Sequence, residues 1–170
     1  MSNLREALAG TALASLEWSE ERERAVDRVA ASGRAPALGL LLWKARYLLE
    51  SKAYLEARRK LVEVFLERYR SESPLMAEKC VDEALSEFMG PACSSCNGAR
   101  ELVTESLRVT CETCQGSGLK RYSDWERASR MQIGLQRLRS VNYKLGWLAG
   151  ELGSLDRAVN SVIAAELERD

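Results

Sequence analysis

The sequence contains no histidine among its 170 residues. Imidazole is the usual acid and base near neutral pH and a common metal ligand, so Ser-His-Asp triads, Cys-His pairs and histidine-based metal helices are excluded. A metal site in this chain must therefore use thiolates or carboxylates. Because no nucleophile–base pair, phosphate-binding loop or open metal site is visible, the sequence predicts a protein without enzymatic activity and without a small-molecule substrate.

Long apolar runs are also missing. The longest apolar stretches, 7–16 and 35–43, are shorter than the roughly 18 residues that a membrane-spanning helix needs. The residues before position 7 include Glu6 and carry no net positive side-chain charge, unlike the start of a secretory signal peptide. We therefore expect a cytoplasmic protein without a membrane partner. The odd number of cysteines, five, fits metal binding in a reducing compartment better than a disulfide framework.

Proline is scarce, and its three positions, Pro36, Pro74 and Pro91, all read as boundaries between segments. Before the cysteine-rich segment, apolar residues recur with the spacing of amphipathic helices over 4–16, 20–32, 36–49, 54–69 and 74–88. Ser51 either ends the third of these helices or lies inside a longer one. After the cysteines, Ser123 followed by Glu126 forms a capping box that predicts the start of another helix.

Residues 91–120 break the helical pattern and carry two C-x-x-C pairs. Two residues between the thiolates allow one turn to present both sulfurs to one metal ion. A glycine follows each pair two places on, Gly98 and Gly116, and lets the backbone fold back so that N–H groups face the sulfurs. Weak alternation over 101–110 predicts a short β-hairpin between the pairs.

The four paired thiolates predict one structural Zn²⁺ ion per chain in a closed tetrahedral site. The predicted ligands are Cys93, Cys96, Cys111 and Cys114. A redox-active dithiol and an iron–sulfur cluster are the alternatives that the same residues allow. The fifth cysteine, Cys80, lies on the apolar stripe of the preceding helix, so we expect it to be a buried core residue.

Residues 145–164 have the pattern of two helices joined by a turn at Gly153. A glycine tolerates the positive φ of such a turn, and the small Ala149 would lie where the second helix crosses the first. Both a DNA-binding helix-turn-helix and an ordinary αα-hairpin fit this pattern. In the helix-turn-helix, Arg157 and Asn160 would face base edges in the major groove.

A net charge of zero hides an uneven distribution. Residues 120–144 carry seven basic and two acidic side chains, a net charge of +5, whereas residues 145–170 carry two basic and five acidic ones, a net charge of −3. The basic segment predicts phosphate contacts with double-stranded DNA, and a solvated helix face is the alternative. The predicted DNA contacts are Lys120, Arg121, Arg127, Arg130, Arg137, Arg139, Lys144, Arg157, Asn160 and Ser161.

The order of these parts resembles the Q late-gene antitermination proteins of lambdoid phages. The resemblance rests on C-x-x-C-x-G, a short hairpin, C-x-x-C-x-G-x-G and a following Lys-Arg-Tyr-Ser segment, and it is most specific over residues 93–125. Arg100 stands where a second glycine would complete the first motif. The resemblance implies a protein of the bacterial host cytoplasm that binds DNA near a late promoter, associates with paused RNA polymerase and its sigma factor, and makes the polymerase read through terminators.

Under this resemblance the four cysteines hold zinc, and another surface, such as Arg58, Arg59 and Lys60, meets the polymerase. The predicted fold is mainly α, a helical domain interrupted by a four-cysteine zinc-binding β-hairpin insert and ending in a helix-turn-helix-like pair. We expect one compact domain with an N-terminal helical region (1–90), a zinc-binding module (91–120) and a basic helix with the C-terminal helix pair (121–170). The alternative function is a zinc-stabilised protein-interaction adaptor that does not bind DNA.

Overall fold

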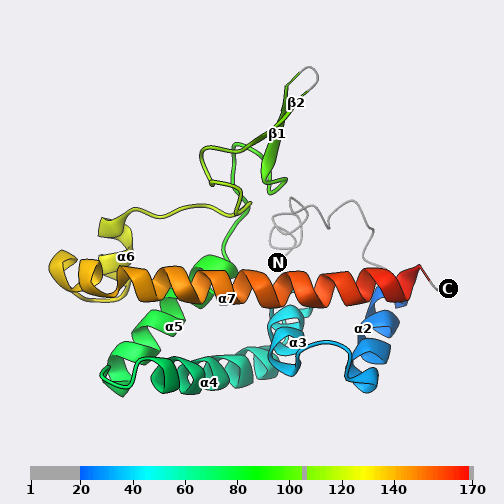
Figure 1. The fold of residues 1–170 in the computed structure, drawn as a ribbon, viewed down its shortest axis with the longest axis horizontal. Helices are drawn as coiled ribbons and strands as arrows, with labels where there is room; N and C mark the ends of the chain where they lie inside the picture. The colour runs from blue at the N-terminus through cyan, green and yellow to red at the C-terminus, as the bar shows by residue number, and fades with distance from the viewer. Residues whose placement is uncertain (1–19, 105–106, 169–170) are drawn as a thin grey trace.

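The structure, a computed structural model, describes residues 20–104 and 107–168 (Figure 1). It is mainly helical, with one small antiparallel hairpin, which confirms the predicted fold class in these respects. The helices are α2 (Glu20–Ser32), α3 (Ala37–Trp43), the π-helix η1 (Lys44–Leu48), α4 (Ser51–Arg68), α5 (Pro74–Phe88), α6 (Asp124–Arg130) and α7 (Leu135–Leu167). The strands are β1 (Glu101–Thr104) and β2 (Leu107–Thr110). The helix expected over 4–16 lies outside the described residues.

Local capping chemistry sets several of the helix boundaries. The Ser73 hydroxyl accepts a hydrogen bond from the Met76 N–H at 3.3 Å, with Pro74 in the first turn of α5. At the start of α6 the Glu126 carboxylate accepts from the Ser123 N–H at 2.7 Å, which confirms the predicted capping box. The helical conformation is interrupted before Ser51, because Leu49 adopts a left-handed conformation with φ of 57° and ends η1.

Helix α7 runs across the whole molecule, with α2, α3, α4 and α5 along one of its sides (Figure 1). Its buried residues recur every three or four positions, as in a helix with one apolar face. They are Leu138, Val141, Leu145, Leu148, Leu152, Asp156, Val159 and Ile163, with Lys144 beside them. The stripe is apolar throughout apart from Asp156 and Lys144, so the two charged positions require partners.

Two clusters of buried side chains lie along this stripe. The N-terminal half of α7 contributes to a cluster that includes Phe65 of α4 and Leu85 of α5. The C-terminal half, with Val159 and Ile163, belongs to a second cluster that includes Trp43 of α3. A Cβ added to Gly39 of α3 would lie 2.8 Å from Val159 Cγ2, so this glycine is what allows α3 and α7 to cross so closely.

The predicted helix-turn-helix pair over 145–164 is wrong, and so is the alternative αα-hairpin. Residues 135–167 form one continuous helix of 33 residues, and Gly153 lies inside it rather than at a turn. The physical reason is the buried stripe, which continues in register past Gly153 and would be broken by a turn. A glycine within a helix costs only about 1 kcal/mol relative to alanine, less than the burial of the side chains beyond it.

Replacing Gly153 by alanine tests the continuity of α7. In a continuous helix we expect the substitution to raise the free energy of unfolding by about 0.5–1 kcal/mol, because alanine loses less backbone entropy on folding than glycine. The nearest atom to the new Cβ is the end of the flexible Arg157 side chain, Nη1 at 3.3 Å. Urea denaturation followed by circular dichroism measures the change. Gly150→Ala, whose Cβ meets nothing within 4 Å, should give a similar gain, and destabilisation by Gly153→Ala alone would contradict the single helix.

Candidate metal centre

The four cysteines of the two C-x-x-C pairs form one compact, buried cluster. Their Sγ atoms all lie within 4.8 Å of one another, with Cys93 and Cys111 4.0 Å apart and Cys96 and Cys114 3.7 Å apart. A tetrahedral ion with metal–sulfur bonds of about 2.3 Å places its sulfurs about 3.8 Å apart. The cluster therefore has the donor set and the spacing of a tetrahedral four-thiolate metal site. Because the protein supplies all four donors, such a site has no open position for water.

Each of the two cysteine pairs is followed by a backbone turn of the same type. Gly98 and Gly116, each two places after its pair, have φ of 84° and 78°, which are left-handed values that glycine adopts at little cost. The Gly118 N–H donates to the Cys114 Sγ at 3.3 Å. The Arg100 N–H faces the Cys96 sulfur in the corresponding position of the first turn. The two turns thus direct backbone N–H groups at the sulfurs, as predicted, and such groups would offset the charge of four thiolates.

These contacts also move the pKa values of the cysteine thiols. Hydrogen bonding from the Cys96 backbone N–H lowers the pKa of Cys93 to about 7, whereas burial raises the pKa of Cys96 to about 11. A metal ion would bind all four as thiolates, so binding releases protons and is favoured by rising pH. Burial also raises the pKa of Cys80 to about 11. Cys80 lies in the helical core and outside the cluster, as predicted.

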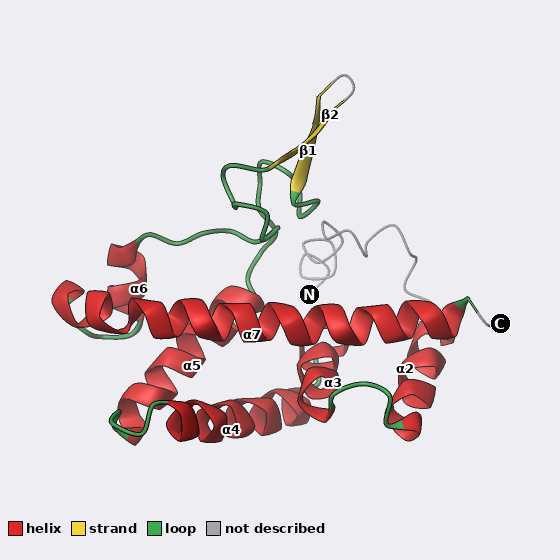
Figure 2. Ribbon diagram, in the orientation of Figure 1, coloured by secondary structure: helices red, strands yellow, loops and turns green. Residues whose placement is uncertain are grey.

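Short backbone pairing closes the cysteine-rich segment at its base. Ala92 and Leu119 form an antiparallel bridge, and the Cys93 N–H donates to the Gly118 carbonyl at 2.8 Å. The segment 91–120, here called the cysteine module, is thus a closed loop joined to the helices at its two ends. Figure 2 shows its strands projecting away from α7, on the side opposite α4 and α5.

The hairpin at the tip of the cysteine module presents apolar side chains to solvent. Strands β1 and β2 pair in the register Leu102 to Val109 and Val103 to Arg108, so residues 102 and 109 share one face and residues 103 and 108 the other. Leu102, Val103, Leu107 and Val109 are all exposed. Packing against the described residues therefore does not explain these apolar residues, which is typical of a surface that meets another molecule.

Loss of one thiolate should release the metal and unfold the module. We expect Cys111→Ser to remove the bound metal ion and destabilise the cysteine module by several kcal/mol, since metal affinity here is folding free energy. Elemental analysis by mass spectrometry measures metal per chain, and hydrogen exchange over residues 91–120 measures unfolding. Cys80→Ala is the matched control and should keep the full metal content. A full equivalent of metal retained by Cys111→Ser would contradict the four-thiolate site.

Four of the eight basic residues predicted to contact DNA form ion pairs within the described part of the chain. Arg127 makes two hydrogen bonds to Glu87 of α5, at 2.5 and 2.9 Å. Arg130 pairs with Glu83, whose side chain is buried. The charge of +5 that the sequence shows over 120–144 is thus largely offset by carboxylates that lie earlier in the chain. Phosphate contacts by Arg127 and Arg130 would require these ion pairs to open.

Lys144 is buried and does not reach the surface, so its predicted role as a phosphate contact is wrong. Its ammonium group donates to Glu72, which also accepts from Arg137 at 2.6 Å. Lys144 Nζ lies 5.0 Å from the centre of the Tyr69 ring, a distance typical of a cation–π contact. The cluster of Glu72, Arg137 and Lys144 joins the N-terminal part of α7 to the loop between α4 and α5, and so stabilises the fold.

The remaining predicted contacts differ in how accessible they are. Lys120, Arg121, Arg139 and Arg157 are exposed and form no ion pair with a described residue. Ser161 is also exposed, and its hydroxyl donates to the carbonyl of the preceding helical turn. Asn160 is half-buried and accepts from the Trp43 indole N–H at 3.0 Å, which orients its amide towards the core of α3 and α7 rather than towards a base.

The suggested polymerase surface on α4 is paired as well. Arg58 binds Asp82 and Glu78 of α5, while Arg59 and Lys60 bind acidic residues four positions away on α4 itself. Exposed pairs of this kind contribute only about 0.2–1 kcal/mol each and open easily. They leave little net positive charge on this face.

The buried pair of Arg46 and Asp156 was missed by the sequence analysis. Arg46 Nη1 lies 3.7 Å from Asp156 Oδ2, and both side chains are 5% exposed. The signal in the sequence was Asp156 itself, which occupies a position of the buried stripe between Leu152 and Val159. An acidic residue at such a position needs a buried cation, but the sequence does not indicate which of its 25 basic residues supplies it.

The Glu72 ion pair makes stability depend on pH. Its hydrogen bond from Lys144 lowers the pKa of Glu72 below the ordinary value of 4.5. Stability from this pair is therefore complete above about pH 4.5 and is lost as the pH falls through the lowered folded pKa. We expect Glu72→Gln to reduce the free energy of unfolding at pH 7 by roughly 1–3 kcal/mol, because Lys144 stays buried without its counter-charge, and to flatten the acid limb of the stability curve.

Chemical denaturation between pH 3 and pH 8 tests this expectation. Glu63→Gln is the control, because Glu63 pairs with Arg59 on the exposed face of α4 and should change stability little. An acid limb in Glu72→Gln as steep as in the wild-type chain would show that other carboxylates cause it.

Comparison of the chain with models of known protein families, with curated proteins and with solved structures finds no match. Within the described residues no helix is both long and apolar enough to cross a lipid bilayer. The resemblance to the phage antitermination proteins therefore rests on the motifs of residues 93–125 and on the order of the other segments.

Proposed function

We propose that this chain is a transcription antiterminator of the phage late-gene class, which binds double-stranded DNA and bacterial RNA polymerase with its sigma factor. The observation that carries the proposal is a closed four-cysteine cluster that supports an exposed apolar hairpin away from the helical body. A closed metal site holds structure and does not catalyse. The chain is thus proposed to act by contact with partners and not as an enzyme.

The metal in this proposal is zinc, one ion per chain. Four thiolates with sulfur separations of 3.7–4.0 Å between opposite pairs suit Zn²⁺, which accepts tetrahedral coordination without preference from its d electrons. Cys93, Cys96, Cys111 and Cys114 would be its ligands. Zinc would supply the folding free energy that the module, which has no core other than its cysteines among the described residues, otherwise lacks.

The partner contacts are proposed on different surfaces. The exposed residues Leu102, Val103 and Leu107 of the hairpin offer an apolar surface for the polymerase, in place of the internally paired basic face of α4. The exposed cations Lys120, Arg121, Arg139 and Arg157 would contact DNA phosphates. Because the described residues contain no helix-turn-helix, this chain would contact DNA mainly through phosphates rather than through base edges. Its affinity for DNA in the absence of polymerase would therefore be weak and salt-dependent.

A second candidate function is a protein-interaction adaptor that does not bind DNA. It is favoured by the internal pairing of Arg127, Arg130 and Lys144, which removes much of the basic surface that the sequence suggests. Under this alternative the exposed apolar hairpin is the main functional surface and the remaining cations are solvated.

DNA binding by the double variant Arg121→Ala/Arg139→Ala distinguishes the two candidates. For the antiterminator we expect weaker binding of a labelled duplex that carries the late promoter, and a slope of log K against log [salt] that is smaller by about 1 for each lost phosphate contact. Fluorescence anisotropy at several salt concentrations measures both. Arg59→Ala on α4 is the control and should bind as the wild type does.

A pull-down of purified RNA polymerase holoenzyme tests the protein contact in parallel. We expect capture by the wild-type chain and loss of capture with Val103→Asp/Leu107→Asp, whose folding is checked by metal content. Capture of polymerase by a chain whose DNA affinity is only nonspecific, about 10⁻⁴ M or weaker, would favour the adaptor. Absence of both interactions would reject the antiterminator.

A further inference from the structure

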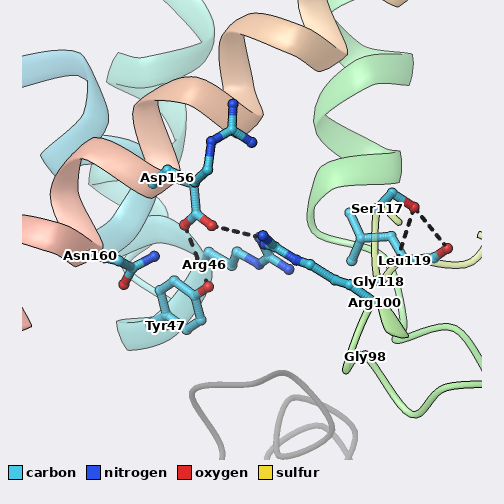
Figure 3. Close-up of a pocket in the computed structure, with 10 residues that line it drawn as sticks. Arg46, Tyr47, Gly98, Arg100, Ser117, Gly118, Leu119, Asp156 and Asn160 are labelled. Atoms are coloured by element: carbon cyan, nitrogen blue, oxygen red, sulfur yellow. Dashed lines mark hydrogen bonds and ion pairs between the residues drawn. The ribbon is translucent and has the colours of Figure 1, made fainter. Parts of the chain in front are cut away.

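A cavity of about 220 Å³ lies between the cysteine module and the helical body. Its volume is several times the roughly 30 Å³ that one water molecule occupies in the liquid. Arg46 of η1 and Asp156 and Arg157 of α7 line it from the helices, and Arg100 lines it from the module. Figure 3 shows Arg100 extending from the module towards the pair of Arg46 and Asp156.

Arg46 is buried in this cavity without a full set of partners. Its side chain is 5% exposed and stacks on the Phe88 ring at 4.5 Å. Its one ionic partner among residues 20–104 and 107–168, Asp156, is 3.7 Å away, which is too long for a hydrogen bond. Its Nε is completely buried and donates to no described residue. A guanidinium has five N–H donors, and a buried one needs acceptors.

The charges of the described residues that line the cavity do not balance. Three arginines, Arg46, Arg100 and Arg157, line it together with one carboxylate, that of Asp156. The Tyr47 hydroxyl also donates to Asp156, at 3.4 Å, and so uses part of its accepting capacity. Asn160 accepts from the Trp43 indole N–H through its oxygen and also hydrogen-bonds the Tyr47 side chain, so both ends of its amide have partners. The lining is thus positive because of its arginines.

The backbone at two of these arginines departs from the usual conformations. Arg46 lies in the π-helix η1, an irregularity that is frequent at functional sites. Arg100 has φ of 69°, and its counterpart in the second turn is Gly118, with φ of 76°. Glycine would fit position 100 with less strain, so the turn itself does not explain the arginine. Strain retained at such a position often marks a functional role for the side chain.

We propose that this cavity binds a phosphate group, held by Arg46, Arg100 and Arg157. Three arginines contributed by η1, α7 and the module suit an anion with several acceptor oxygens pointing in different directions. A phosphate has this shape, whereas a carboxylate is planar and has two oxygens. The ligand would balance the charge of these arginines and would link the cysteine module to α7.

The phosphate has two possible sources, free inorganic phosphate and the backbone of a nucleic acid. The inference does not rest on antitermination, because free phosphate tests the cavity directly. Failure of phosphate binding would leave the polymerase contact untouched, and loss of the polymerase contact would leave phosphate binding untouched.

Titration of the full-length, metal-loaded chain with inorganic phosphate tests the proposal by calorimetry. We expect saturable binding by the wild type and at least tenfold weaker binding by Arg100→Gly and by Arg157→Gln. Because Arg100→Gly also relieves the left-handed strain, its melting temperature without phosphate should not fall. Arg108→Gln removes a charge from the same module outside the cavity and should bind phosphate as the wild type does.

Melting curves with and without phosphate give an independent readout. Phosphate should raise the melting temperature of the wild type and of Arg108→Gln, and should leave that of Arg100→Gly unchanged. No saturable binding by the wild type, or equal affinity in Arg100→Gly and Arg157→Gln, would overturn the proposal and leave Arg46 and Asp156 as a structural pair.

A competition experiment identifies the source of the phosphate. If phosphate displaces a labelled DNA duplex from the wild type at constant ionic strength, with sulfate-free chloride salt as the balance, and has no such effect on Arg100→Gly, the site takes nucleic-acid phosphate. If phosphate binds without displacing DNA, the site takes the free anion. Both results support the cavity as a phosphate site.

Discussion

The structure depends on the burial of one face of a single helix. Helix α7 has 33 residues and is about 50 Å long, too long to be covered by any one neighbour. Its N-terminal half packs with α4, α5 and α6, and its C-terminal half packs with α2 and α3. The register of α7 therefore sets where both core clusters lie. The close crossing of α3 at Gly39 and Val159 depends on the same register.

The two charged positions of that face pair with earlier segments of the chain. Lys144 and Asp156 lie among apolar residues of α7, and each has a partner from an earlier segment, Glu72 and Arg46. Asp156 brings the arginine of η1 to the edge of the cysteine module, where Arg100 enters the same cavity. The cysteine module and α7 thus share a cavity lined mainly by charged and polar residues. A ligand in the cavity would change how firmly the module is held.

The sequence predicted the local features well and the long-range ones poorly. The capping box of Ser123 and Glu126 and the turns at Gly98 and Gly116 involve residues at most four positions apart, so spacing alone identifies them. The four-cysteine cluster was equally predictable, because few arrangements bring two C-x-x-C pairs to one metal. The break expected at Gly153 was wrong, since a local preference for a turn was outweighed by burial on both sides of it. Whether DNA or polymerase is bound stays a prediction.

By itself, then, the sequence determined the helical class, the hairpin insert and the four cysteines that can hold a metal, because these follow from periodicity and from contacts between near neighbours. Only the tertiary structure decided which charges are available. It paired Arg127 with Glu87 and Lys144 with Glu72, and it left Arg100 and Arg157 at a cavity beside Arg46. The physical reason is that Coulomb and hydrogen-bond energies depend on distance in space and on burial. Neither quantity can be calculated from the order of charges along the chain.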